Sequence, residues 1–308
     1  MNRRHFLRGA LAGAGAAAGL VAARPRTSAA EKEPPMPKGQ AVLKLSSQEG
    51  RIPGKTFKEK VDLLAQWGGV GIELGGANLA GRAAEVAKAL EGTPLKVSAI
   101  CAGYFGLIDP DPAKRKEGAE KLKETLKPAG DMGSTGVIVV PAFNKHPQLD
   151  WDEGLKVLTD LLPEVGEHAV KCGTRVLFEP LNKAEARFLN RLEQGVAICK
   201  AANHPGISMM GDFYHMGREE KDDEAAFVLA GPWLHHVHLA SRLRVLPGQD
   251  KRKDPNADEW SFVAGFRGLK KVGFQDYSSL ECGCVGKPEE EIPKSFRFLE
   301  DQWKQAVV

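Results

Sequence analysis

The sequence has few cysteines, little net charge and no long apolar run beyond its first thirty residues, and each shortage excludes a class of protein. Five cysteines, an odd number in 308 residues, do not form the disulfide framework of a small secreted domain. No later segment approaches the roughly eighteen consecutive apolar residues that a membrane-spanning helix needs. With 42% hydrophobic and 27% charged residues, the composition is that of a globular chain and not of a disordered or collagen-like one.

The first thirty residues have the composition of a leader. Arg3 and Arg4 precede an alanine- and glycine-rich run, and small residues occupy 28–30. The segment 1–30 resembles a twin-arginine signal peptide, which implies export to the periplasm or the cell exterior. An ordinary basic N-terminal anchor is the alternative. The charged, proline-rich segment 31–40 is expected to be a flexible linker, so that the folded domain spans 41–308.

The small positive charge of the chain comes from that leader. The whole sequence holds 43 basic and 40 acidic side chains. Five arginines and no acids lie within 1–30, so 38 basic and 40 acidic side chains remain, a net charge of about −2. A protein that binds nucleic acid through its phosphates would normally keep a strongly positive surface. We therefore expect no nucleic-acid partner.

Short apolar, β-branched runs alternate with longer helical stretches along 41–308, which is typical of βα units and a parallel sheet. The predicted strands are 42–45, 70–74, 96–100, 137–140, 175–178, 207–210, 236–239 and 277–280. Helical periodicity is clearest over 56–67, 114–127, 151–172 and 191–202. An open Rossmann sheet would need a glycine fingerprint after its first strand, and residues 46–50 lack one. The pattern predicts the α/β class and a closed (β/α)8 TIM barrel.

The last four predicted strands end in side chains that bind metal ions: Glu179, Asp212, His238 and Glu281. Their separations of 33, 26 and 43 residues each correspond to one βα unit. The carboxyl ends of TIM-barrel strands meet at the face that carries the active site. Three carboxylates and one imidazole suit a divalent ion such as Mn2+, Mg2+ or Co2+, whereas a structural zinc site prefers thiolates. A single acid at a strand end often only faces solvent, but four in register predict a metal site.

Four stretches carry a resemblance to a known family. They are FEPLNKAEARFLN at 178–190, GDFYHM at 211–216, HVHLASRLRVLPG at 236–248 and SLECG at 279–283. Through them, and over 41 to 303, the chain resembles the xylose isomerase-like TIM barrel superfamily of sugar isomerases and epimerases. Within it, the chain is most similar to the ketose 3-epimerase group that acts on tagatose, fructose and allulose.

The resemblance implies a role for each matching residue. Glu179 and Glu281 would both bind the metal and act as the catalytic acid/base pair, and Asp212 and His238 would complete the ligand set. The sugar hydroxyl groups would be contacted by Glu185, His215 and Arg244. One divalent ion is implied, with Mn2+ expected and Mg2+, Co2+ or Zn2+ as alternatives. A small carbohydrate substrate and a homo-oligomer are also implied.

These residues predict an isomerase, either a sugar epimerase or an aldose–ketose isomerase. One glutamate would remove the proton next to a ketose carbonyl to give an enediolate, and the other would return a proton. A lyase or epimerase acting on 3-keto-glycosides is an alternative that export favours. A non-catalytic carbohydrate-binding barrel is another. A nuclease related to the AP endonucleases is disfavoured because Gln48, Glu73, Cys101 and Pro141 stand at the earlier strand ends where it needs histidines.

Two further features near the predicted site have more ordinary interpretations. His236 shares a strand face with His238 and could lie behind the metal ligands or contact substrate. Cys282 and Cys284 follow Glu281, but they are expected to be packed or free thiols and not metal ligands.

Overall fold

The computed structural model describes residues 33–308, and these residues belong to one compact unit. The signal peptide predicted over 1–30 lies outside the described residues. The linker predicted over 31–40 stays a prediction. Its described part has no helix or strand, Glu33 forms an ion pair with Lys200, and the Gln275 side chain donates to the carbonyl oxygen of Lys38. No helix within residues 33–308 combines the length and the apolar character that crossing a membrane requires.

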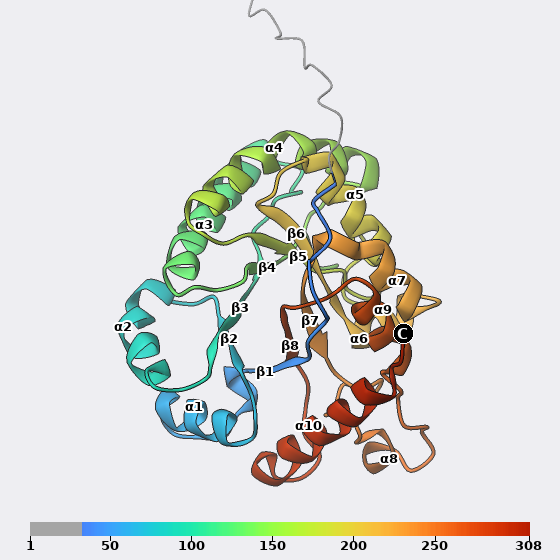
Figure 1. Ribbon diagram of the computed structural model, residues 1–308. Helices are drawn as coiled ribbons and strands as arrows, with labels where there is room; N and C mark the ends of the chain where they lie inside the picture. The colour runs from blue at the N-terminus through green and yellow to red at the C-terminus, as the bar shows by residue number, and fades with distance from the viewer. Residues whose placement is uncertain (1–32) are drawn as a thin grey trace, which may run out of the picture. The chain divides into compact units, whose positions relative to one another are not determined.

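Eight parallel strands close into a barrel, which confirms the predicted fold class (Figure 1). Each strand pairs with the next one in the chain, and the last pairs with the first. The strands are β1 Lys44–Gln48, β2 Gly71–Gly75, β3 Lys96–Tyr104, β4 Val137–Val140, β5 Val176–Phe178, β6 Ile207–Asp212, β7 Leu234–Leu239 and β8 Tyr277–Leu280.

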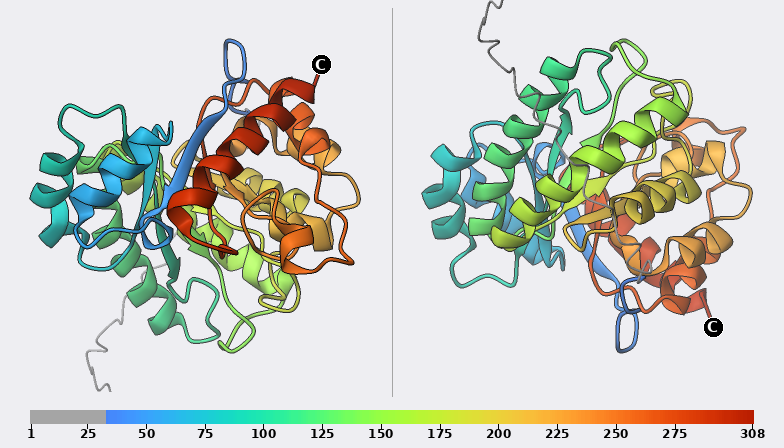
Figure 2. Two further views of the ribbon diagram at one scale, coloured as in Figure 1. Left: turned by 90° about the horizontal axis from the view of Figure 1, so that it is seen from below. Right: turned by 90° about the horizontal axis from the view of Figure 1, so that it is seen from above.

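The helices surround the strands in chain order, with α3 and α4 on one side and α10 on the opposite side (Figure 1). Figure 2 shows α10 running along the outside of the barrel, where it packs beside α9. The helices are α1 Phe57–Gln66, α2 Leu79–Leu90, α3 Pro112–Asp131, α4 Trp151–Lys171, α5 Leu192–Ala202, α6 Phe213–Glu219, α7 Asp223–Ala230, α8 Asp250–Lys253, α9 Val263–Lys271 and α10 Pro288–Gln305, with 3-10 turns η1 Glu49–Arg51 and η2 Gly231–Trp233.

The helices form where the sequence supplies caps and an apolar stripe. Thr56 and Glu59 form a capping box at the start of α1, and Asp150 caps α4 by accepting the N–H of Glu153. In α4 the buried residues Leu158 and Leu162 recur at helical spacing and face the sheet. The main apolar core therefore lies between the strands and the surrounding helices.

A separate small apolar cluster forms where β3, β4, β5 and β6 contribute Ala99, Ile138, Leu177 and Met210. Leu177 lies two residues before Glu179, and Met210 lies two residues before Asp212. Because alternate residues of a strand share a face, both acids extend from the face that carries this cluster. The apolar layer thus forms a floor beneath the carboxyl ends of the strands.

The predicted strands match the observed ones where the residues are apolar. Where a strand ends in polar residues, the predicted strand is too short. The segments 137–140 and 277–280 were predicted with the observed bounds. The first strand was predicted at 42–45, but Val42 is 46% exposed and the strand runs instead through Ser46 and Ser47 to Gln48. The sixth strand likewise extends beyond the predicted 207–210 to Asp212. Hydrophobicity marks a strand poorly where its side chains face a polar site.

Candidate active site

The four strand-end residues come together at the carboxyl end of the barrel. Each offers one ligand atom, and these atoms lie within 4.8 Å of one another: Glu179, Asp212, His238 and Glu281. They come from the adjacent strands β5 to β8. Asp212 and His238 are among the last two residues of their strands, and Glu179 and Glu281 directly follow theirs. Nδ1 of His238 lies 3.2 Å from Glu179, 3.4 Å from Glu281 and 3.9 Å from Asp212. Three carboxylates and one imidazole therefore surround a common point.

The buried polar atoms of this cluster fit a divalent cation. Asp212 and His238 are fully buried and Glu179 nearly so. One oxygen of Asp212 accepts the N–H of Tyr214 at 2.7 Å, but its Oδ2 has no hydrogen-bond partner among residues 33–308. A buried carboxylate oxygen without a donor is destabilising, and a cation bound there would remove that cost. Oxygen donors with one imidazole are a set that divalent ions accept.

Burial and neighbouring charges shift the pKa values of the cluster in different directions. Burial raises the pKa of Asp212 well above its usual range and also raises the pKa of Glu179. Burial alone would raise the pKa of Glu281, but His238 outweighs it and the pKa lies at about 2. Burial alone would lower the pKa of His238, but Glu73 and Glu281 raise it well above normal. A metal ion and a proton therefore compete for the Nδ1 lone pair of His238.

A second group of polar side chains adjoins Glu281. The Arg244 guanidinium donates to Glu281 at 2.9 Å and to Glu185 at 3.3 Å, and it lies 3.4 Å from Nε2 of His215. The Asn182 amide lies 3.0 Å from Glu185 and 2.7 Å from Nδ1 of His215. Burial, reinforced by Arg244, lowers the pKa of His215 to about 3, so its ring is neutral near pH 7. The structure thus places Glu185, His215 and Arg244 together beside the cluster, with donors and acceptors suited to hydroxyl groups.

Arg244 is held in a strained turn. Its φ of 55° lies in the left-handed region, which is uncommon for a non-glycine residue. Its N–H donates to the carbonyl oxygen of Ser241, and its own carbonyl oxygen accepts the N–H of Gly283, both at 2.9 Å. The guanidinium lies over the Tyr214 ring, 4.4 Å from its centre. These contacts aim the side chain at Glu281.

Glu73, a fully buried carboxylate in β2, makes contacts that the sequence did not predict. Glu73 lies 2.8 Å from Nε2 of His236 and 3.0 Å from Nε2 of His238, and it accepts the Gln48 amide at 2.9 Å. His236 therefore faces Glu73 and not the four-residue cluster. The available signal was one acid within the otherwise apolar strand GIELG. Since its histidine partners are 163 and 165 residues away, no local spacing pointed to them.

The cysteines near the site are free thiols in the structure. All five cysteines are free, and Cys282 is buried while Cys284 is half-buried. Neither belongs to a group of three or more potential metal ligands in the described part of the chain.

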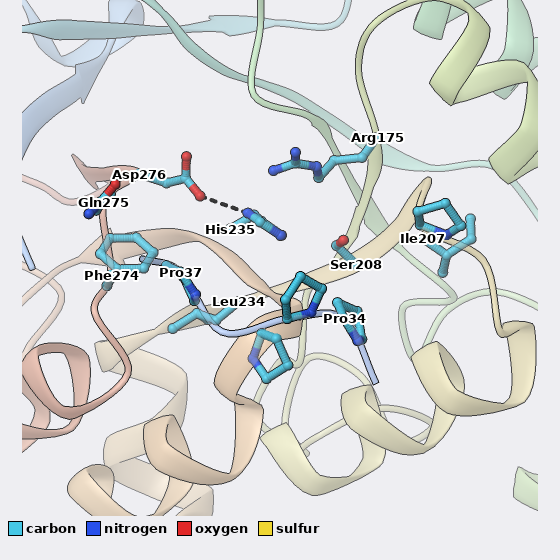
Figure 3. Close-up of a pocket in the computed structure, with 13 residues that line it drawn as sticks. Pro34, Pro37, Arg175, Ile207, Ser208, Leu234, His235, Phe274, Gln275 and Asp276 are labelled. Atoms are coloured by element: carbon cyan, nitrogen blue, oxygen red, sulfur yellow. Dashed lines mark hydrogen bonds and ion pairs between the residues drawn. The ribbon is translucent and has the colours of Figure 1, made fainter. Parts of the chain in front are cut away.

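A hollow of about 390 Å³ lies at the opposite, amino-terminal end of β5 to β8 (Figure 3). Its polar lining includes Arg175, just before β5, and the pair formed by His235 and Asp276 at 2.7 Å. Prolines within 34–37 form one wall. No group of three or more potential metal ligands within 33–308 lies in this lining. In TIM barrels, residues at the amino-terminal end contribute to stability and residues at the carboxyl end carry out catalysis. The two polar clusters of this barrel lie toward the carboxyl end, in agreement with that rule.

The chain is similar to several proteins that are named as sugar epimerases. A 3-dehydro-D-guloside 4-epimerase of Escherichia coli (strain K12) is 27% identical over 250 residues, which are 78% of this chain and 92% of that protein. An L-ribulose 3-epimerase of Mesorhizobium japonicum is 26% identical over 238 residues, 75% of this chain and 74% of that protein. The crystal structure of a 3-keto-D-glucoside 4-epimerase from E. coli aligns with a TM-score of 0.74 at 26% identity, covering 84% of this chain and all of that one.

The family assignment extends over most of the barrel. A family model described as xylose isomerase-like TIM barrel matches residues 61–302, from α1 to α10. Together with the closed eight-stranded sheet, this match shows that the chain belongs to the xylose isomerase-like TIM barrel family.

Proposed function

We propose that this protein is a metal-dependent sugar epimerase, an isomerase that inverts a carbon centre next to a ketone carbonyl of its substrate. The observation that carries the proposal is the convergence of Glu179, Asp212, His238 and Glu281 on one point. The sugar epimerases among the related proteins support it.

The four converging residues would hold the metal ion. We propose Mn2+, and Mg2+, Co2+ and Zn2+ are other ions that three carboxylates and an imidazole accept. When bound, the ion would polarise the carbonyl and an adjacent hydroxyl oxygen and so make the neighbouring C–H bond more acidic.

Glu179 and Glu281 would carry out the proton transfers. They stand at the ends of β5 and β8, with β6 and β7 between them. One carboxylate removes the proton, the C–H electron pair forms a C=C bond, and the carbonyl π electrons move to oxygen to give an enediolate. The other glutamate, as a carboxylic acid, returns a proton to the opposite face of the same carbon, and the carbonyl forms again. The centre is inverted, and the two glutamates have exchanged protonation states.

The polar group beside Glu281 would orient the sugar. Arg244 and Glu185 offer a charged donor and a charged acceptor, and neutral His215 adds a ring nitrogen that interacts with hydroxyl groups. Holding the substrate this way keeps the reacting carbon between the two glutamates, so proximity contributes to the rate.

A second substrate class, 3-keto-glycosides, is favoured by a specific observation. The 3-dehydro-D-guloside 4-epimerase is matched over 92% of its length, whereas the L-ribulose 3-epimerase is matched over 74%. On such a substrate the same proton abstraction next to the keto group leads to epimerisation, or to loss of the leaving sugar in a lyase.

Exchange of substrate protons with heavy water tests the proposal. The Mn2+-loaded protein is incubated with a panel of free ketoses and with a 3-keto-disaccharide, and NMR locates deuterium in the recovered sugars. We expect deuterium at the carbon next to the carbonyl and the matching epimer in at least one case. Product analysis of the 3-keto-disaccharide separates epimerisation from elimination. Sugar binding without any exchange would contradict an epimerase and favour a carbohydrate-binding barrel.

We also propose that the protein is exported by the twin-arginine pathway to the periplasm or the cell exterior, and that it forms a homo-oligomer. The paired Arg3 and Arg4 support export. Replacing both with lysine should leave the protein in the cytoplasmic fraction, and light scattering measures the oligomeric state.

A further inference from the structure

Glu73 is a buried carboxylate to which the proposed reaction gives no role. It is fully buried in the middle of β2, on the far side of His238 from the four-residue cluster. An unpaired buried carboxylate would be costly, and Glu73 avoids this cost through contacts with three side chains, His236, His238 and Gln48. His236 and His238 are on β7, whose end contributes to the four-residue cluster, and Gln48 is the last residue of β1.

The two ring nitrogens of His238 face different partners. Nδ1 faces Glu179 and Glu281 in the cluster, whereas Nε2 lies 3.1 and 3.0 Å from the two oxygens of Glu73. A neutral imidazole can offer a lone pair from one nitrogen only if the proton is on the other. For Nδ1 to bind a cation, Nε2 must therefore carry the proton, and Glu73 is the acceptor placed to hold it there.

Glu73 is itself fixed by two further contacts. Nε2 of His236 lies 2.8 Å away, and Nδ1 of that ring has no partner among residues 33–308, so the ring proton belongs on Nε2, where it meets the carboxylate. The Gln48 Nε2 atom lies 2.9 Å from an oxygen of Glu73 and 2.9 Å from an oxygen of Glu281. Since both partners are carboxylates, the amide nitrogen and not the oxygen must face them. Gln48 thus joins Glu73 to a member of the cluster.

The same atoms could be taken for a second ion site, because ligand atoms of Glu73, His236 and His238 also lie within 4.8 Å of one another. The contacts favour hydrogen bonds instead. Both histidine nitrogens and the Gln48 amide already point N–H donors at this carboxylate, and an ion there would have to displace them. An ion bound there would also replace the proton on Nε2 of His238, and that proton is what leaves the Nδ1 lone pair free for the four-residue cluster.

We propose that Glu73 is a positioning residue that fixes His238 in the Nε2-protonated tautomer and holds its Nδ1 toward the metal site. The inference rests on the proposed metal site. Such outer carboxylates on a ligand histidine typically change metal affinity by about 10–100-fold when removed.

Nitrogen-15 NMR of the histidine side chains in the full-length wild-type protein tests the tautomer directly. With Zn2+ as a diamagnetic probe ion, we expect Nε2 of His238 to carry a slowly exchanging proton and Nδ1 to show the metal-bound shift. Metal bound at Nε2, or a proton on Nδ1 in the loaded protein, would overturn the inference. This measurement needs no variant and does not depend on turnover.

Glu73→Gln tests the effect on affinity. Glutamine has one acceptor oxygen for three N–H donors, and its own NH2 group would face another donor. We expect the dissociation constant for Mn2+ to rise about 10–100-fold and the Nε2–H signal to be lost or to exchange rapidly. Glu73→Asp keeps the carboxylate and should recover part of both. Glu291→Gln is the matched control, because Glu291 is also a buried carboxylate with several donors but lies in α10.

The outcomes separate this inference from the proposed function. Wild-type protein that binds ions, with Glu73→Gln binding them equally well, would overturn the role of Glu73 and leave the epimerase proposal intact. Binding of two ions by the wild type, with the second lost in Glu73→Gln, would also overturn it in favour of a second site. Wild-type protein that binds no divalent ion would overturn both.

Discussion

Glu281 is the side chain on which the contacts of the site converge. Nδ1 of His238 and a nitrogen of Arg244 lie 3.4 and 2.9 Å from one of its oxygens, and the Gln48 amide lies 2.9 Å from the other. The same carboxylate therefore adjoins the proposed ion, the proposed substrate group and the network behind the metal ligands. No other described residue joins all three.

Glu281→Gln removes the charge and the proton acceptor while keeping the size of the side chain. We expect kcat to fall by about 10²–10⁴-fold, because general acid–base catalysis contributes on that scale. Chromatographic detection of the epimer measures the rate. Glu290→Gln, which changes an exposed acid of α10, is the control and should react at the wild-type rate. A similar rate in both variants would remove Glu281 from the mechanism.

Arg244→Lys removes the guanidinium and leaves the backbone strain unchanged. Lysine has the same conformational free-energy cost as arginine at a φ of 55°. A single ammonium group cannot bridge Glu281 and Glu185 while lying over the Tyr214 ring. We expect KM to rise about tenfold or more, with a smaller change in kcat. Steady-state kinetics give both constants, and a fall in kcat at unchanged KM would argue against a substrate-binding role.

At the scale of elements, the sequence predicts the four proposed ligands because each stands at or near the end of an apolar run, and it misses the contacts of Glu73. Glu179 and Glu281 were found because each follows a complete strand, and the βα spacing placed them in register. Glu73 was named only among the earlier strand ends and was given no role, because its partners come from β1 and β7 and only closure of the barrel brings them together. Contacts across a closed sheet leave no periodicity in the chain.

The loops after β1 and β2 are tied together by an ion pair at the catalytic end. Both oxygens of Glu49, in η1, accept from Arg82 of α2 at 2.8 and 2.7 Å, and Glu49 also accepts the N–H of Gly75. Burial alone would raise the pKa of Glu49, but the Arg82 hydrogen bonds outweigh it and lower the pKa. The ion pair between Glu49 and Arg82 thus holds together the loops that follow Gln48 and Glu73.

Glu49→Gln should lower the free energy of unfolding by about 1–2 kcal/mol at pH 7, since a charged hydrogen-bonded pair is lost. The folded pKa of Glu49 is lowered, so its stabilisation is present above the unfolded value of about 4.3 and is lost as pH falls through the folded value. Denaturant unfolding of both proteins should therefore converge at acid pH. A constant difference from pH 7 down to about pH 3 would contradict the assignment.

At the scale of the whole molecule, the proposed ion joins four strands that form half of the barrel. Since only the folded chain brings these strands together, an ion that binds there stabilises the fold as a whole. We expect free Mn2+ at a hundred times its dissociation constant to add about 2.7 kcal/mol, and to raise Tm by several degrees. Calorimetry with and without a chelator measures the effect, and Asp212→Asn should reduce it sharply. An equal rise in that variant would place the ion elsewhere.

Anomalous diffraction from crystals of the Mn2+-loaded protein tests the central claim most directly. The account predicts one strong peak within about 2.0–2.4 Å of a ligand atom from each of Glu179, Asp212, His238 and Glu281. Those atoms already lie within 4.8 Å of one another. A peak elsewhere, or none at saturating Mn2+, would contradict it.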